Sequence, residues 1–301
     1  MKFCGIRYNE VIYVFLDNES TTAYMCAFVK AHHMRTNLFK IYEDRLCEKL
    51  LFDKYDMIKG SIEQGADFFE KGAGADKVIN SYLAGNVIAR TAFNLNRLNN
   101  AVFLNTRQYV NLASGLDVTG YEKGSLCRSV KIFDLDRYSM LKSKKEMLEN
   151  IEANTYSIVF IPCDLACDNI VASLIMKGFC ISEKSYFAMF GITQYLSHTE
   201  FESLLHSVSL LSCKGTALAF DYQSTQDKKI NALANGAGEE MKADYSDEYV
   251  FETLRKNVFR IYELMNSRDI EQTYFERYNQ IYPEKKMKLQ GDLNLVLAVK
   301  K

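Results

Sequence analysis

From residue 107 to residue 222 the chain alternates between short apolar runs and segments with helical spacing. The apolar runs cover residues 109–113, 130–135, 156–162, 184–190 and 215–222, and the segments between them cover 118–127, 137–150, 167–177 and 198–211. Short, continuous apolar runs are typical of parallel strands that are buried on both faces of a sheet. Repeated strand–helix units with right-handed crossovers predict an α/β fold with a doubly wound, Rossmann-like sheet.

The ends of the chain add a helical region before the sheet and two more strands after it. Residues 258–262 and 293–299 are further apolar runs, which brings the expected number of strands to about seven. Before the sheet, segments with helical spacing cover 23–51, 53–72 and 77–99. Only two prolines occur and no Pro/Gly/Ser-rich linker is visible, which favours one continuous domain. We therefore expect residues 1–100 to form a helical cap of the same domain as the sheet region, 101–301.

Polar side chains gather where the predicted strands end. In open α/β sheets, ligands bind beyond the carboxyl ends of the strands. The residues at these ends include Ser114 and Gly115, Asp134 and Asp136, Asp164, Tyr195, and Asp221. An Asp before a helix can instead act as an N-cap, and this alternative stays open for Asp164. Several acids at consecutive strand ends favour a binding site.

The turn after the first strand narrows the class of ligand. Residues 109–117 read as a strand, a small-residue turn and the start of a helix, and a second strand ends at Asp134 and Asp136 about twenty residues later. This is the layout of a nucleoside-binding half-domain, although the same pattern occurs in parallel-sheet domains without a cofactor. A dinucleotide needs several turn glycines for its pyrophosphate, and neither G-x-G-x-x-G nor a P-loop is present. S-adenosylmethionine carries no phosphate, so one close backbone approach and a ribose-binding carboxylate suffice.

Composition and charge exclude several other classes. The net charge of −1 argues against nucleic acid as a partner. No apolar run reaches about 18 residues and the start lacks the core of a signal peptide, so we expect a cytoplasmic protein without a membrane partner. The eight cysteines include no C-x-x-C. Cys163 and Cys167 are not followed by a second Cys/His pair, and we expect no metal site. The oligomeric state stays open.

Five motifs in fixed order resemble the leucine carboxyl methyltransferase family, which includes bacterial polyketide O-methyltransferases of the tetracenomycin type. They are Ala-Arg-Thr-Ala-Phe at 89–93, Tyr-Val-Asn-Leu-Ala-Ser-Gly-Leu-Asp at 109–117, Phe-Asp-Leu-Asp at 133–136, Pro-Cys-Asp-Leu at 162–165 and Gly-Ile-Thr-Gln-Tyr-Leu at 191–196. The likeness runs from about residue 20 to residue 222. It implies an S-adenosylmethionine-dependent methyltransferase with a mostly parallel seven-stranded sheet, in which the last strand lies antiparallel beside the fifth.

The resemblance also implies roles for individual residues. The expected cofactor contacts are Arg90 with the methionine carboxylate, Ser114 and Gly115 under the amino-acid part, Asp134 or Asp136 with the ribose hydroxyls, Asp164 and Leu165 with the adenine, and Tyr195 near the cofactor and the substrate entrance. A planar guanidinium suits the carboxylate contact. The resemblance gives no general base.

Two positions depart from the family pattern. The family usually has Gly-Ala-Gly in the turn, where this chain has Ala113, Ser114 and Gly115. The family commonly has Glu where this chain has Phe190. An Ala113 methyl group could crowd the cofactor, and Phe190 removes a carboxylate from the pocket.

Three hypotheses follow for the function. The first is an O-methyltransferase that transfers the methyl group of S-adenosylmethionine to a carboxyl or hydroxyl group of a small molecule. The second is a decayed methyltransferase domain that binds a partner and has weak or no cofactor affinity, as Ala113 and Phe190 suggest. The third is a nicotinamide oxidoreductase, which the missing pyrophosphate glycines disfavour.

Overall fold

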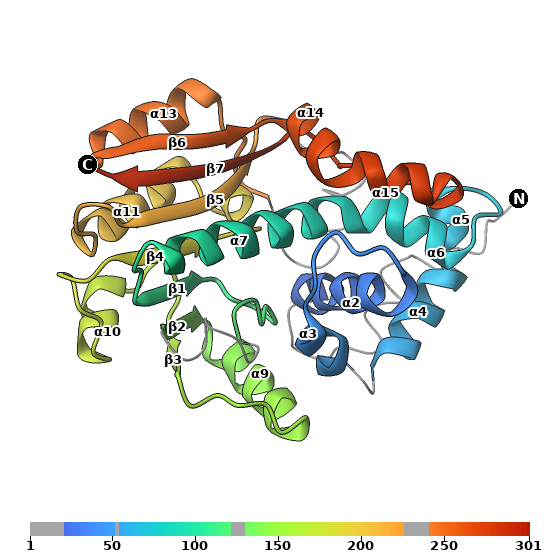
Figure 1. Cartoon of the computed structure of the whole chain (residues 1–301), viewed down its shortest axis with the longest axis horizontal. Coiled ribbons are helices and arrows are strands. Elements are labelled where there is room, and N and C mark those ends of the chain that lie inside the picture. Colours follow the sequence, from blue (N-terminus) through green and yellow to red (C-terminus); the bar gives the residue numbers. More distant parts are fainter. Residues whose placement is uncertain (1–20, 52–53, 122–129, 226–240) are drawn as a thin grey trace, which may run out of the picture.

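A mixed seven-stranded sheet forms the centre of the protein, in the order β3-β2-β1-β4-β5-β7-β6. The computed structural model describes residues 21–51, 54–121, 130–225 and 241–301 (Figure 1). The strands are β1 Gln108–Leu112, β2 Lys131–Asp136, β3 Ile158–Pro162, β4 Ser185–Met189, β5 Ala217–Gln223, β6 Phe259–Met265 and β7 Leu293–Lys300. All seven expected strands are confirmed. The expected antiparallel last strand is confirmed too, because β7 pairs antiparallel with both β5 and β6.

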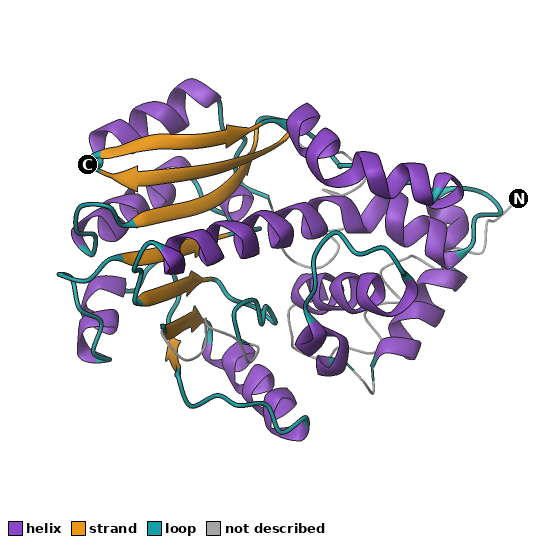
Figure 2. Cartoon of the chain, in the orientation of Figure 1, coloured by secondary structure: helices purple, strands orange, loops and turns teal. Residues whose placement is uncertain are grey.

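Helices cover both faces of the sheet and build the region before it (Figure 2). The helices before the sheet are α2 Thr21–Thr36, α3 Arg45–Leu50, α4 Tyr55–Gln64, α5 Ala66–Phe69 and α6 Ala75–Val78, which we call the cap, and α7 Gly85–Phe103. A π-helical turn at Ile79–Ala84 joins α6 to α7. The helices of the sheet region are α9 Tyr138–Asn150, α10 Ile170–Met176, α11 His198–Leu210, α13 Asp247–Lys256, α14 Ser267–Ile270 and α15 Glu276–Ile281. Helix α7 runs across the sheet, and α2 to α6 lie at one end of it (Figure 1).

Three expected helices differ from the structure. The segment 53–72 is divided at Gly65 into α4 and α5. The segment 23–51 is interrupted at 37–44, where the backbone N–H of Ile41 donates to His33 Nε2 at 3.0 Å and Asp44 caps the new helix α3. These contacts satisfy backbone groups that a continuous helix would have paired internally. Of the expected helix 118–127, residues 118–121 form turns, and the remainder lies outside the described residues. The sequence also favours a helix near 227–236, and that segment lies outside the described residues.

Both faces of the sheet are apolar, which explains why its strands read as continuous apolar runs. Tyr109, Ile132 and Tyr186 pack in one core cluster with α7 and the cap. Their neighbours Val110 and Phe133 pack in a second cluster with α10, α11 and α13. Successive strand residues point to opposite faces, so a strand buried on both sides carries no polar alternation.

A fully buried ion pair joins β2 to α9. The Lys144 ammonium donates to Asp134 Oδ2, and both side chains are 0% exposed. The hydroxyl of Tyr121 donates to the same carboxylate, and burial and Asp134 together raise the pKa of this phenol well above its usual value. Removing one partner of a buried pair leaves an uncompensated charge in the core, so the pair depends on both members.

We predict that Lys144→Met lowers the free energy of unfolding by about 3 kcal/mol, because the Asp134 carboxylate stays buried without its cation. Urea denaturation followed by far-UV circular dichroism measures the change. Lys142→Met is the control on the same helix, since Lys142 is 63% exposed and pairs only loosely with Glu146; it should change stability by less than about 0.5 kcal/mol. Equal effects of the two substitutions would contradict the prediction.

Candidate functional site

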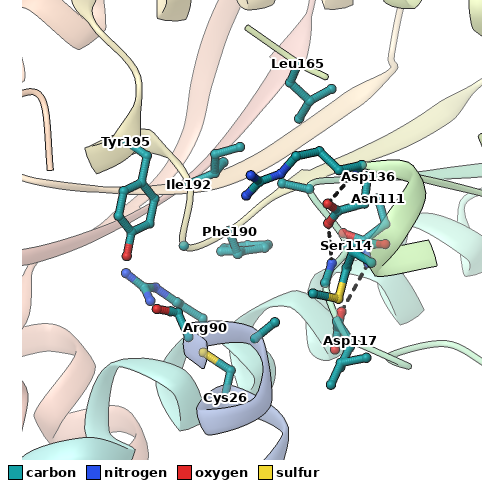
Figure 3. A pocket seen from close by; sticks show the side chains of 18 of the residues that line it. Cys26, Arg90, Asn111, Ser114, Asp117, Asp136, Leu165, Phe190, Ile192 and Tyr195 are labelled. Carbon is teal, nitrogen blue, oxygen red and sulfur yellow. Dashed lines mark hydrogen bonds between the residues drawn. The ribbon is translucent and has the colours of Figure 1, made fainter. Parts of the chain in front are cut away.

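A cavity of about 670 Å³ lies between the cap and the tips of β1, β2, β3 and β4. The strand order reverses between β1 and β4, which pair in parallel, and ligand-binding crevices in open α/β sheets form at such a point. The lining comes from α2, α7, the turn after β1, and the segments after β2, β3 and β4. Its volume is within the range of small-molecule sites. Figure 3 shows ten of the lining side chains with labels.

The turn after β1 forms one wall of the cavity. The Ser114 backbone N–H donates to the carbonyl of Leu135 at 3.0 Å, and the Gly115 N–H donates to Asp136 Oδ2 at 2.7 Å. The N–H of Arg137 donates to the other oxygen of Asp136, also at 2.7 Å. Burial nevertheless raises the pKa of Asp136 above its usual value, and the two backbone N–H groups oppose that shift. The tips of β1 and β2 are thus tied together at the cavity.

The structure separates the two acids that the sequence left as alternatives for the ribose. Asp136 lines the cavity. Asp134 does not: it is 0% exposed and paired with Lys144. Asp134 points to the face of the sheet where α9 packs, two residues before the strand tip. Its assignment as a ligand contact is therefore corrected, and Asp136 is the candidate.

Arg90 reaches the cavity from α7 and is held by Asp221 at the end of β5. Its Nε and Nη2 lie 2.8 and 2.6 Å from Asp221 Oδ2, and the N–H of Gly191 donates to Asp221 Oδ1 at 2.6 Å. Asp221 is 0% exposed, whereas the Arg90 side chain is 13% exposed. Gly191 has φ +71°, and a Cβ there would lie 3.4 Å from Arg90 Nη1. The buried acid therefore fixes the guanidinium beside a backbone position that favours glycine.

The other expected site residues also line the cavity. Asp164 and Leu165 follow β3, and Tyr195 lies in a short 3₁₀ turn after β4, with its hydroxyl directed toward Arg90 (Figure 3). Asp164 is not the cap of α10, because Asn169 takes that role. Its Oδ1 instead accepts from the N–H of Ala166 at 3.0 Å, within the turn.

An ion pair joins the cap to the turn after β1 at the border of the cavity. Lys30 of α2 pairs with Asp117, which also accepts from the N–H and hydroxyl of Thr119 and from the amide of Asn111. Burial alone would lower the pKa of Lys30, but Asp117 and Asp44 more than offset it, so the pKa of Lys30 is raised. Burial acts to raise the pKa of Asp117, and Lys30 outweighs it, so that pKa is lowered. Both groups stay charged at neutral pH.

The two departures from the family pattern have different consequences. Ala113 has φ +56°, the left-handed conformation in which glycine is unstrained and an L-residue costs about 1 kcal/mol. Phe190 packs edge-on against Phe93, with ring centroids 6.3 Å apart, and forms part of the wall (Figure 3). Neither side chain fills the cavity.

Several buried polar atoms of the lining have no hydrogen-bond partner. Within the described part of the chain they are the hydroxyl of Ser114, the amide oxygen of Gln194 and the amide oxygen of Asn94. Buried polar groups in folded proteins are normally paired with protein or water, so unpaired ones at a cavity can bond to a polar ligand or to water. In the same part of the chain no cluster of three or more His, Cys, Asp or Glu is arranged to hold a metal ion.

This fold and this site define the class of the protein. Over 83% of the chain, the structure superposes with a TM-score of 0.50 on all of magnesium protoporphyrin IX methyltransferase from Synechocystis PCC 6803, solved with bound S-adenosylhomocysteine. The two sequences are 10% identical, so the likeness concerns the fold. The protein has the Rossmann-like fold of S-adenosylmethionine-dependent methyltransferases.

Sequence comparison then gives the family. The family described as leucine carboxyl methyltransferase matches residues 23–209. YktD of Bacillus subtilis, provisionally named as an S-adenosyl-L-methionine-dependent methyltransferase, is 25% identical over 283 residues, which is 86% of this chain and 92% of YktD. A Frankia alni protein with the same kind of name is 30% identical over 138 residues, 46% of this chain and 49% of that protein. The chain belongs to the leucine carboxyl methyltransferase family and is an S-adenosylmethionine-dependent methyltransferase. The comparison confirms the resemblance found in its motifs.

Sequence reasoning missed the residues that hold the site together. Asp221 was noticed at a strand end but not as the partner of Arg90, and Lys30 and Asp117 were not assigned. Lys30 and Asp117 are 87 residues apart in the chain. A single sequence gives no signal for such a pair. Once the fold is known, the buried position of Lys30 indicates that it must have an acidic partner.

We predict that Ala113→Gly raises the free energy of unfolding by about 0.5 kcal/mol. Relief of about 1 kcal/mol of left-handed strain outweighs the greater freedom that glycine gives the unfolded chain. Chemical denaturation is the measurement. Ala166→Gly is the control in the same lining, since Ala166 does not have positive φ; it should lose about 0.5–1 kcal/mol. A similar loss in both variants would show that Ala113 is not strained.

Proposed function

We propose that this protein transfers the methyl group of S-adenosylmethionine to a carboxylate oxygen of a small molecule. The observation that carries the proposal is the state of the possible proton acceptors among the described residues that line the cavity. Within the described residues, no His lines it. The lining acids are engaged: Asp117 with Lys30, Asp136 with two backbone N–H groups, and Asp164 with the N–H of Ala166.

The state of Asp117 strengthens this reasoning. Asp117 is the acid on the cap side of the cavity, where we expect the acceptor, and its pKa is lowered by Lys30 against the effect of burial. A carboxylate with a lowered pKa is a poor proton acceptor. A hydroxyl acceptor needs a base at the reacting oxygen, whereas an ionised carboxylate is already a nucleophile. The chemistry available at the cavity therefore suits a carboxylate better than a hydroxyl group.

The cofactor contacts follow from the residues at the cavity. We propose that Arg90 holds the methionine carboxylate, that Ser114 and Gly115 lie under the amino-acid part, and that Asp136 accepts from the ribose hydroxyls. Asp164 and Leu165 would contact the adenine, and Tyr195 would lie at the acceptor entrance. The hydroxyl of Ser114, which has no partner of its own, supports this orientation.

The protein's contribution to methyl transfer is mainly positional. The cofactor supplies an electrophilic methyl group when bound, and the reaction requires an acceptor oxygen aligned with it at roughly 3–3.5 Å. Arg90 is fixed by Asp221, the cap is joined to the turn by Lys30, and Phe190 forms an apolar wall between them. These rigid contacts would hold the acceptor in line and keep water from the reacting atoms.

The test uses S-adenosylmethionine with a radiolabelled methyl group and a panel of small carboxylic acids and phenols. Transfer to a carboxylate gives a methyl ester, so mild alkali releases the label as methanol. Transfer to a hydroxyl gives an ether that keeps the label under the same treatment. We expect alkali-labile label. Alkali-stable product would overturn the carboxylate assignment and leave O-methylation intact.

The backbone strain at Ala113 supports a second candidate function, that of a binding protein with a decayed methyltransferase domain. Ala113 in the left-handed conformation favours the hypothesis of a decayed methyltransferase domain, because the family has glycine there. That hypothesis predicts that S-adenosylhomocysteine does not bind at millimolar concentration in calorimetry. Clear binding would remove it.

We predict that Arg90→Lys weakens the binding of S-adenosylhomocysteine at least tenfold, because an ammonium cannot contact Asp221 and a ligand carboxylate with the planar geometry of a guanidinium. Binding of 5′-methylthioadenosine, which lacks the amino-acid part, should stay unchanged. Isothermal titration calorimetry measures both ligands.

The matched control is Arg97→Lys on the same helix. Arg97 also pairs with a carboxylate, Glu263, and packs over Phe93, but it does not line the cavity. It should leave both affinities unchanged. Equal losses for the two ligands in Arg90→Lys would mean that Arg90 supports the site without contacting the amino-acid part.

A further inference from the structure

A row of cations runs along the edge of the sheet opposite the cavity, where the parallel strands begin. The members of this basic edge are Arg107 before β1, Lys131 at the start of β2, Lys177 after α10, Lys184 before β4 and Lys214 before β5, and all five are exposed. They come from segments spread over more than a hundred residues. The sheet brings them together, because parallel strands all begin at the same edge.

Backbone and side-chain contacts show that the basic edge is continuous. The backbone N–H of Lys131 donates to the carbonyl of Arg107 at 2.9 Å. The backbone N–H of Arg107 donates to the carbonyl of Lys184 at 3.1 Å. The Lys131 ammonium reaches the carbonyls of Lys177 and Gly178, both at 3.2 Å. The aliphatic part of the Lys184 side chain lies beside Gly215, the residue that follows Lys214. These segments lie toward the left side of Figure 1.

Acids are fewer than cations at this edge. In the described segments 103–107, 131, 151–157, 176–184 and 210–216 there are five cations and two acids, Glu152 and Glu183. The chain as a whole has a net charge of −1. The excess of positive charge is therefore a local property of this edge, and it attracts an anionic partner over about a Debye length.

Large apolar side chains project from the same loops. Phe103 and Leu104 end α7 and are 91% and 67% exposed, and Met176 at the end of α10 is 79% exposed. Ile181 and Leu210 are also exposed, 41% and 54%. The loops of the basic edge therefore present bulky apolar side chains beside cations.

We propose that this basic edge, with its projecting apolar side chains, is a peripheral contact surface for an anionic lipid membrane. Lys and Arg next to bulky apolar groups are the composition of interfacial membrane contacts. The apolar groups stand on three separate loops, and a fluid bilayer can accept separate side chains without a matching shape, whereas a protein partner needs a packed, complementary patch. None of the described helices is long and apolar enough to span a bilayer, so the contact would be superficial.

The proposal is independent of the methyl-transfer function. The cavity lies at the opposite ends of the same strands, so the contact would leave the cavity facing water. The expectation of no membrane partner rested on the lack of a spanning segment and of a signal-peptide core. A superficial contact requires neither of these.

Co-sedimentation of the full chain with vesicles tests the proposal. We expect binding to vesicles of phosphatidylglycerol and phosphatidylcholine, little binding to pure phosphatidylcholine, and loss of binding as salt is raised. Lys184→Glu with Lys214→Glu should weaken partitioning at least about tenfold, since each cation near an anionic surface contributes about 1 kcal/mol, roughly a fivefold factor. The affinity for S-adenosylhomocysteine should not change.

The matched control reverses two charges elsewhere. Arg268 and Lys288 are exposed and belong to the segment between β6 and β7, away from the basic edge. Arg268→Glu with Lys288→Glu changes the net charge by the same amount and should leave partitioning within about twofold, because surface attraction acts over a Debye length. Phe103→Ser with Leu104→Ser, which keeps every charge, should weaken partitioning at least fivefold.

Three outcomes would overturn the proposal. The first is no binding of the wild-type chain to anionic vesicles. The second is an equal loss in the edge and control charge variants, which would indicate only a general charge effect. The third is binding of the wild-type chain to polyglutamate but not to vesicles, which would assign the basic edge to an acidic protein.

Discussion

The reversal of strand order between β1 and β4 is the constraint on which the rest of the structure depends. From β1 the sheet extends to β2 and β3 on one side, and from β4 it extends to β5 and the antiparallel strand β7 on the other. The connections on the two sides leave in opposite directions, so the tips of β1 and β4 are not covered by a crossover. The cavity occupies this place. The opening therefore follows from the arrangement of the apolar strands and does not depend on the polar residues that line it.

Three contacts turn that opening into a defined cavity. Asp136 accepts from Gly115 and joins the tips of β1 and β2, Asp221 holds Arg90 against the end of β4, and Lys30 joins the cap to the turn through Asp117. In each contact a carboxylate meets a cation or a backbone N–H in a partly desolvated place, where such interactions are strong and the loss of one partner is costly. Asp117, whose pKa is lowered by Lys30, is a poor proton acceptor. This links the architecture of the site to the kind of acceptor proposed for it.

The two ends of the sheet differ in the chemistry they present. At the carboxyl ends, paired acids and bases surround a cavity with unpaired buried oxygens, which suits a polar ligand of limited size. At the amino ends, exposed cations and projecting apolar side chains lie along one edge, which suits an extended anionic surface. Since opposite ends of the same strands carry the two features, a contact at one end leaves the other accessible.

The sequence by itself determined the class of fold and most of the candidate site. Strands such as 109–113 and 184–190 are buried on both faces, so their signal is a local run of apolar residues that needs no knowledge of the partner strand. Glycine and acids at strand ends are local signals too, and they indicated Ser114, Gly115, Asp136 and Asp164. Arg90, Leu165 and Tyr195 were expected from the resemblance to the family. All seven residues line the cavity.

Only the tertiary structure decided which charged groups meet. It showed that Asp134 is used by Lys144 in the core while Asp136, two residues later, faces the cavity, because strand residues two apart share a face but differ in depth along it. In the tertiary structure Lys30 also pairs with Asp117, and Arg107, Lys131 and Lys184 lie on one edge of the sheet. Charged side chains carry no periodic pattern that reports a distant partner, and their pairing follows from how the apolar elements pack.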